Sequence, residues 1–328
     1  MTIASTGLSR GRYQARRGGF ALIAVLWVTV MVAALGASVS LVARRSVRTA
    51  RNRRSYARAL WTAEGCLERA RATIRAALVA DASTTAGALG QRGHVSTWNR
   101  LDDVVASSGP GRAPGCDVTA RPLGDAVDVN TGEEPVLRAV LGTVHFTPAR
   151  VDSLAAALLD WRDKDDEPRP AGAESAWYRD HGRSPPRNGP LASLAELRLV
   201  RGFEASEAFD SLLSVEPARI ALSRAPVRVL ALLPGMTPEA ATVISERRKG
   251  GGLGEDLLAL GGELSRAARD SIAAHYSELS AMVTSEPDAW LLEARASDEG
   301  SPVRVGIELK LVRSGNRPAV VRRRVRWL

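Results

Sequence analysis

An uncharged apolar segment near the N-terminus constrains this chain more than any other feature of its sequence. The 23 residues from Phe20 to Val42 carry no charged side chain. As a helix rising about 1.5 Å per residue, the segment can cross the roughly 30 Å hydrocarbon core of a bilayer. The apolar region of a signal peptide is usually about 7–15 residues long, so this length favours a membrane helix that the mature protein keeps.

The residues before the apolar segment form a basic leader. Met1 to Gly19 contains four arginines and no acidic residue, and two glycines directly precede Phe20. In an ordinary signal peptide the small residues of the cleavage site follow the apolar region, whereas here they come before it. Cleavage of this leader would leave the apolar helix on the mature chain. The alternative is an uncut N-terminal signal anchor.

This arrangement resembles the class III signal of type IV pilins and of the pseudopilins of type II secretion. The resemblance implies that a prepilin peptidase cuts after Gly19 and methylates Phe20, the first mature residue. The fifth mature residue of these proteins is usually Glu, but here it is Ala24. A carboxylate in the bilayer costs on the order of 2.5–3.5 kcal/mol, and in pilin assembly it meets the N-terminal amine of the subunit added before. Ala24 therefore indicates a first subunit, at the fibre tip, as in the minor pseudopilin component K.

Seven arginines after the apolar segment conflict with the positive-inside rule, which alone would place them in the cytoplasm. Because the leader must meet its peptidase on the cytoplasmic side, we expect the opposite orientation. The chain would then be a single-pass protein of the bacterial inner membrane, with its bulk in the periplasm. We expect the arginines to contact lipid head groups or carboxylates of a neighbour. They are Arg44, Arg45, Arg48, Arg51, Arg53, Arg54 and Arg58.

The composition is that of an ordinary folded protein, with 328 residues of which 45% are hydrophobic and 25% are charged. This length predicts two or more domains. The net charge of +9 permits nucleic-acid binding but does not require it. Cys66 and Cys116 are the two cysteines. A disulfide between them and two free thiols both remain open, because the sequence does not fix the distance between their Cα atoms.

Hydrophobic periodicity predicts the main elements outside the middle of the chain. Apolar residues three to four positions apart extend the first helix to about Ala80. Residues 81–124 show no strong period apart from a short strand at 116–120. Near the C-terminus, alternation and turn residues predict an antiparallel meander of three strands, over 289–295, 303–311 and 319–327. The apolar stripe of the first helix consists of Leu60, Ala63, Leu67, Ala70, Ile74 and Ala77.

The middle of the chain, about residues 127–282, is predicted to be helical and contains a weak internal repeat. The stretches 129–161 and 220–248 each have an extended start, a helix, and a second helix that opens with Thr-Pro. Thr147-Pro148 and Thr237-Pro238 supply an N-cap followed by proline at the first helical position. The pattern predicts two small helical units inserted into a domain that carries a sheet.

An acidic segment at the end of the second predicted helix is the strongest candidate for chemistry. Closely spaced carboxylates repel one another unless a cation or arginines neutralise them, and Ca²⁺ takes six to eight such oxygens. A solvated loop, a calcium site and paired-carboxylate catalysis are the three interpretations, and an EF-hand is excluded because its Gly and Glu are out of register. The acidic residues are Asp160, Asp163, Asp165, Asp166, Glu167 and Glu174.

The segments DWRDKDDEPRPAGAE (160–174) and NGPLASLAELRLVRG (188–202) resemble the inserted domain of the component K minor pseudopilins of type II secretion. The resemblance implies an α+β fold, in which a long N-terminal helix packs on an antiparallel sheet that carries a large all-helical insertion of two SAM-like units. It also implies bound Ca²⁺, for which we select Asp163, Asp165, Asp166 and Glu174 as ligands. The second unit departs from the family, with Ser223-Arg224 where Asn-Thr is usual.

The resemblance also gives an expected domain plan and function. The domains are a leader (1–19), a transmembrane helix (20–42), a helix continuation with the first part of the pilin-like domain (43–126), the helical insertion (127–282) and the C-terminal strands (283–328). The function is that of a non-enzymatic minor pseudopilin at the tip of the pseudopilus. Its expected partners are components I and J, with H as a further candidate, the prepilin peptidase and the inner-membrane assembly platform, and no nucleic acid.

Two functions of other classes stay open as hypotheses. The first is a membrane-anchored DNA receptor, because residues 232–248 resemble a helix-hairpin-helix. Its turn, Gly235-Met236-Thr237, lacks the usual second glycine, which favours a hairpin that packs on the protein itself. The second is a periplasmic hydrolase that uses the acidic segment. The glycine-rich stretch 249–257 lacks the Gly-Lys-Ser/Thr of a P-loop and is interpreted as a connector.

Overall fold

The computed structural model describes residues 18–87, 96–107, 115–144, 146–203, 206–249, 257–315 and 317–327. The chain divides into two compact units, Met1–Ala57 and Arg58–Leu328. The first helix, α1 (Gly18–Gly87), contributes residues to both units. It agrees with the predicted helix and continues several residues past Ala80.

In the first unit, α1 carries the apolar segment. Large apolar side chains from Leu22 to Val42 are exposed, and the helix is long and apolar enough to cross a membrane. The hydroxyls of Thr29 and Ser38 donate to carbonyl oxygens three or four residues earlier in the same helix. These two hydroxyls are therefore satisfied within the helix, as hydrocarbon surroundings require.

The second unit contains a four-stranded antiparallel sheet in the order β1-β6-β7-β8. The C-terminal meander is thus confirmed. The apolar residues of β7 at alternate positions from Val305 to Leu311 are buried, as the period of two predicts, and so is Gly306. The strands are β1 (Cys116–Pro122), β6 (Ala289–Ser297), β7 (Arg304–Ser314) and β8 (Arg317–Trp327).

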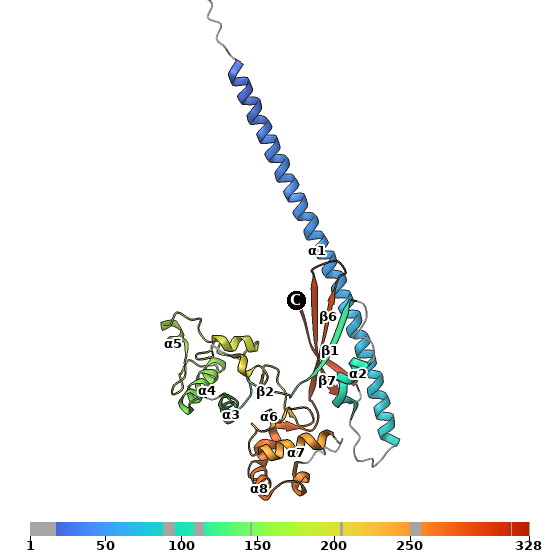
Figure 1. The fold of residues 1–328 in the computed structure, drawn as a ribbon, viewed down its shortest axis with the longest axis vertical. Helices are drawn as coiled ribbons and strands as arrows, with labels where there is room; N and C mark the ends of the chain where they lie inside the picture. The colour runs from blue at the N-terminus through green and yellow to red at the C-terminus, as the bar shows by residue number, and fades with distance from the viewer. Residues whose placement is uncertain are drawn as a thin grey trace, which may run out of the picture. The chain divides into compact units, whose positions relative to one another are not determined.

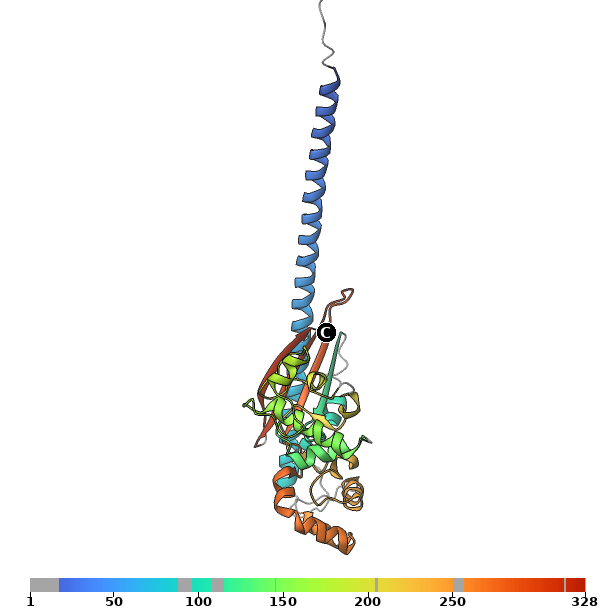
Figure 2. The ribbon, with the colours of Figure 1, turned by 90° about the vertical axis from the view of Figure 1, so that its left-hand side faces the viewer.

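The C-terminal half of α1 lies beside this sheet in both views (Figures 1 and 2). Glu64 pairs with Arg323 of β8, and Cys66 is joined to Cys116 of β1. The predicted apolar stripe is largely correct, although Leu60 and Ala77 are only half-buried. The buried face consists of Ala59, Ala63, Cys66, Leu67, Ala70, Ile74 and Leu78.

A short helical segment lies where the sequence shows no strong period. It comprises η1 (Thr97–Arg100) and α2 (Leu101–Ser107), and α2 packs on β1. Buried Trp98 anchors it by donating from Nε1 to the carbonyl of Pro287 at 2.7 Å. The sequence did not indicate this segment because two helical turns are too short to establish a period.

Two helical units lie between β1 and β6 in the chain. A parallel pair of two-residue strands closes each unit, β2 with β3 in the first and β4 with β5 in the second. The first unit contains β2 (Val127–Asp128), α3 (Glu134–Gly142), α4 (Pro148–Arg162), α5 (Ser175–Asp180), η3 (Leu194–Leu199), η4 (Ser206–Phe209) and β3 (Leu213–Ser214). The second contains β4 (Ile220–Ala221), α6 (Val227–Leu230), α7 (Pro238–Lys249), η5 (Leu257–Gly262), α8 (Arg266–Ala274), α9 (Tyr276–Met282) and β5 (Val283–Thr284).

The predicted Thr-Pro helix starts are confirmed in both helical units. The Thr147 hydroxyl accepts a hydrogen bond from the backbone N–H of Arg150, at the start of α4. The Thr237 hydroxyl accepts from the backbone N–H of Ala240, at the start of α7. Each cap satisfies one of the free N–H groups of the first helical turn. One continuous apolar core runs through both helical units and includes Trp161 and Ile244.

Candidate functional site

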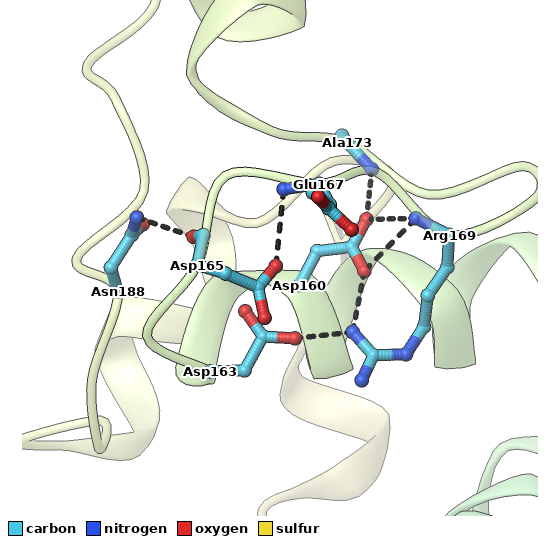
Figure 3. Close-up of polar contacts among 7 residues, drawn as sticks. All are labelled: Asp160, Asp163, Asp165, Glu167, Arg169, Ala173 and Asn188. Carbon is cyan, nitrogen blue, oxygen red and sulfur yellow. Dashed lines mark hydrogen bonds and ion pairs between the residues drawn. The ribbon is translucent and has the colours of Figure 1, made fainter.

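The candidate site begins at Asp160, in the last turn of α4. This carboxylate is fully buried, between apolar neighbours in the sequence. It accepts hydrogen bonds from the backbone N–H of Ala173 at 2.8 Å and from Nη1 of Arg169 at 2.7 Å (Figure 3). Burial raises the pKa of Asp160, and the hydrogen bonds from Arg169 and Ala173 partly oppose that rise.

Two residues of the following loop fit closely around this carboxylate. The guanidinium of Arg169 also donates to Asp163, so it neutralises charge on both aspartates. Gly172 passes so near Asp160 that an added Cβ would lie 2.0 Å from Oδ2. Only glycine permits this approach, since real Cβ atoms do not come within 3.0 Å of another heavy atom.

Asp160, Asp163 and Glu174 converge on one point. One carboxylate oxygen from each lies within 4.8 Å of the others. Both oxygens of Glu174 and Oδ1 of Asp163 are buried and have no hydrogen-bond partner among the described residues. Glu174 is only 2% exposed, and burial together with the charges of Asp160, Asp163 and Asp166 raises its pKa to about 8.

These oxygens fit a bound cation. Arg169 pairs with Asp160 and Asp163, and no described donor reaches Glu174. Buried oxygens without donors are costly unless a proton or a metal ion satisfies them. Ca²⁺ prefers carboxylate oxygens and completes its shell with water or carbonyl groups. Asp163 and Glu174 would be the ligands with free oxygens. Such an ion would link the end of α4 to Glu174, the residue directly before α5.

The other two selected ligands are not among the three residues of this cluster, although the charge of Asp166 acts on Glu174. Asp165 and Asp166 are exposed. Oδ1 of Asp165 accepts from the backbone N–H of Glu167, and its carbonyl accepts from Nδ2 of Asn188 (Figure 3). Oδ1 of Asp166 accepts from the backbone N–H of Ser175, and hydrogen bonds from Ser175 lower the pKa of Asp166.

Asp160 was in the acidic segment but was not selected as a ligand. The signal that could have identified it is its spacing of three residues from Asp163, which places both carboxylates on one side of a helical turn.

The two cysteines lie at the contact between α1 and β1. The structure bonds Cys66 to Cys116, with their Cα atoms 6.7 Å apart. Cys66 is fully buried and Cys116 is nearly so. Nη2 of Arg69 lies 3.1 Å from the sulfur of Cys66.

The hairpin before α7 packs against the protein itself. Gly235 has a φ of +70°, and an added Cβ would lie 2.6 Å from the carbonyl oxygen of Ser271 and 2.8 Å from Cβ of His275. This close approach occupies the turn that a DNA phosphate would need, so the geometry favours the packing interpretation over the DNA-binding one. Residues 250–256 of the glycine-rich stretch lie outside the described part of the chain.

The structure describes only some of the residues around the predicted processing site. Gly19, Phe20 and Ala24 belong to α1. Residues 1–17 of the predicted leader lie outside the described part of the chain. Cleavage after Gly19 therefore stays a prediction.

The long N-terminal helix, the antiparallel sheet and the helical insertion define the class of protein, which is a pilin-like α+β protein with an inserted domain. Comparison with known proteins gives one family match, over part of the chain. Residues 119–215 match the family described as "Type II secretion system (T2SS), protein K". No curated protein matches the chain.

A solved structure shares the fold over most of the chain. It is described as "The Crystal Structure of the GspK-GspI-GspJ complex from enterotoxigenic Escherichia coli Type 2 Secretion System". The match has a TM-score of 0.62 and 18% sequence identity, and it covers 84% of this chain and 99% of the other. At this identity the likeness shows a common fold, and the α+β prediction is confirmed. The match of residues 119–215 is thus to protein K of the type II secretion system, and the solved structure adds the common fold.

Proposed function

We propose that this protein is a non-enzymatic minor pseudopilin at the tip of the type II secretion pseudopilus. It would start assembly with other minor pseudopilins, components I and J and the further candidate H, for export of folded proteins across the outer membrane. The observation that carries the proposal is the insertion of residues 127–284 between neighbouring strands β1 and β6. A head enlarged in this way is difficult to accommodate inside a close-packed filament but suits its end.

The N-terminal segment supports the same role. The exposed apolar stretch of α1 suits an inner-membrane anchor, with the bulk of the chain in the periplasm. Because residue 24 is Ala, the helix has no carboxylate at this position in the lipid. The subunit therefore does not need the N-terminal amine of a preceding subunit to neutralise one. The prepilin peptidase would remove residues 1–19 and methylate Phe20 before the chain joins the assembly platform.

The carboxylate cluster would serve the insertion as a structural calcium site. Its free oxygens on Asp163 and Glu174 support this role. Asp165 and Asp166, the other ligands expected from the family resemblance, stay as further candidate ligands, and Asp166 already acts on Glu174. The site would stabilise a head whose surface meets the other minor pseudopilins.

The partner assignment can be tested with the full chain. We would co-express the tagged protein with components I and J of the same organism and with the prepilin peptidase, then purify it in mild detergent. All three proteins should elute together, and replacing I and J by the major pseudopilin should abolish co-elution. Elution of the tagged chain alone would contradict the proposal.

Processing is measured on the same sample by intact-mass spectrometry. We expect a loss of residues 1–19 and a gain of one methyl group when the peptidase is present. A full-length mass in its presence would contradict the predicted leader.

A further inference from the structure

Six arginines on α1 have no counter-charge among the residues that the structure describes. Arg44, Arg45, Arg48, Arg51, Arg53 and Arg54 are exposed, and none of them forms an ion pair with a described residue. No acidic residue occurs between Gly18 and Ala63. The next arginine, Arg58, is paired with Asp298 at 3.1 Å. We call these six residues the basic collar. Their uncompensated charge favours an anionic partner.

Depth along the helix divides this collar. Arg44 and Arg45 lie about 3 and 4.5 Å beyond Val42 along the axis, at about 1.5 Å per residue. The polar layer on each side of the hydrocarbon core is about 5–7 Å thick, so both arginines lie within it. Arg51 and Arg54 lie about 13 and 18 Å beyond Val42 and are outside that layer. Only the first part of the collar can reach lipid head groups directly.

The surface beside Arg45 carries a shallow hollow. The hollow has a volume of about 670 Å³ and runs along the helix at this level. Its end nearest the apolar segment is Val42, and Arg45 and Ser46 follow. An acyl chain can lie against Val42 while a phosphate meets the guanidinium and the hydroxyl, and arginine binds phosphate with two parallel hydrogen bonds. The hollow is completed by Thr49, Ala50 and Arg53.

We propose that Arg45, with Ser46, binds the phosphate of an anionic phospholipid in the membrane that α1 crosses, and that Arg44, at nearly the same depth, adds to the attraction. The inference rests on the membrane-anchored part of the proposed function and holds for either orientation of the helix. Charge favours an anionic lipid over a zwitterionic one, because each arginine near the surface adds about fivefold to the affinity for anionic lipid. The site would fix the height of α1 in the bilayer before assembly.

The test uses the full chain reconstituted in phosphatidylcholine vesicles with trace spin-labelled phosphatidylglycerol or phosphatidylcholine. Electron spin resonance gives the ratio of the two association constants at the protein surface. The test variant is R44Q/R45Q and the matched control is R51Q/R54Q. Both remove two charges from the same helix, and Gln has nearly the helix propensity of Arg. Circular dichroism confirms equal helicity.

The wild type and the control should prefer phosphatidylglycerol, and R44Q/R45Q should lose most of that preference. The difference should shrink at high salt. Equal ratios for both lipids in the wild type, or the same loss in both variants, would overturn the proposal. Either result would instead favour contact between the basic collar and carboxylates of a neighbouring subunit. Lipid selectivity is read without components I and J, so its failure is distinguishable from failure of the proposed assembly.

Discussion

Nη1 of Arg169 lies 2.7 Å from Oδ1 of Asp160, and this ion pair holds the loop after α4 against the core of the first helical unit. The carboxylate is fully buried, whereas the Arg169 side chain is 40% exposed. The ion pair therefore stabilises the charge of Asp160. Without Arg169, this desolvated carboxylate would have only backbone donors as partners.

Replacing this arginine should destabilise the helical insertion. R169Q is expected to lower the free energy of unfolding by about 1.5–3 kcal/mol, because a hydrogen-bonded buried charge loses its charged partner. The matched control is K164Q, which removes an exposed positive charge from the same loop and should change stability by less than about 0.5 kcal/mol. Urea unfolding of both variants at pH 7 measures the difference. Equal stability of R169Q and K164Q would show that Arg169 does not compensate Asp160.

Glu174 should make stability depend on pH when calcium is absent. Its pKa in the folded chain is about 8, above the ordinary value of 4.5. The folded state therefore binds this proton more tightly, so the stabilisation is complete below pH 4.5 and is lost as the pH rises through 8. Relative to E174Q, the wild type should lose up to about 1.4 kcal/mol per pH unit between these values in EDTA.

Calcium should reverse this loss at pH 8. Binding to the folded state raises stability by mass action, so the wild type should gain stability and E174Q should gain much less. Urea unfolding with calcium and with EDTA measures both effects. Parallel pH profiles of the two proteins, with no response to calcium, would exclude a cation at this cluster.

The sheet could be predicted in part because its strands alternate regularly. The period of two in β7 and the turn after it gave the C-terminal meander. The pairing of β1 with β6 places Cys116 opposite Ala296. The two residues are far apart in the sequence, and no local pattern encodes such a contact. The parallel pairs that close the two helical units have two residues per strand, too few for any period.

The candidate site was predicted only at the level of its segment. The sequence showed a dense run of acids, and Asp163 and Glu174 do converge. Asp160 could not be selected from charge density, because its role depends on burial in the last turn of α4 and on the close passage of Gly172. Tertiary packing, rather than composition, decides which carboxylates face one another.

Gly235 should be sensitive to substitution because of its surroundings as well as its backbone. G235A places a Cβ 2.6 Å from the Ser271 carbonyl at a φ of +70°. Gly182 has a similar φ of +62° with nothing within 4 Å, so G182A is the matched control. G182A should cost about 1 kcal/mol from backbone strain alone, and G235A should cost clearly more. Thermal unfolding of the two variants measures the difference, and equal losses would refute tight packing of the hairpin on α8.

The bond between Cys66 and Cys116 should contribute to stability by closing a loop of 50 residues. Chain entropy gives about 4 kcal/mol for a loop of this size. The double variant C66S/C116S should therefore unfold at a markedly lower urea concentration, and reduction of the wild type should have a similar effect. Two thiols that react with a thiol reagent in the unfolded, unreduced protein would show that the cysteines are not paired.

Cryo-electron microscopy of assembled pseudopili, with a tag on the C-terminus of this chain, is the most direct measurement of its central role. The account predicts one labelled subunit at one end of each fibre, with its helical insertion outside the filament. Label repeated at regular intervals along the shaft would contradict a tip subunit and the interpretation of Ala24 as the mark of one.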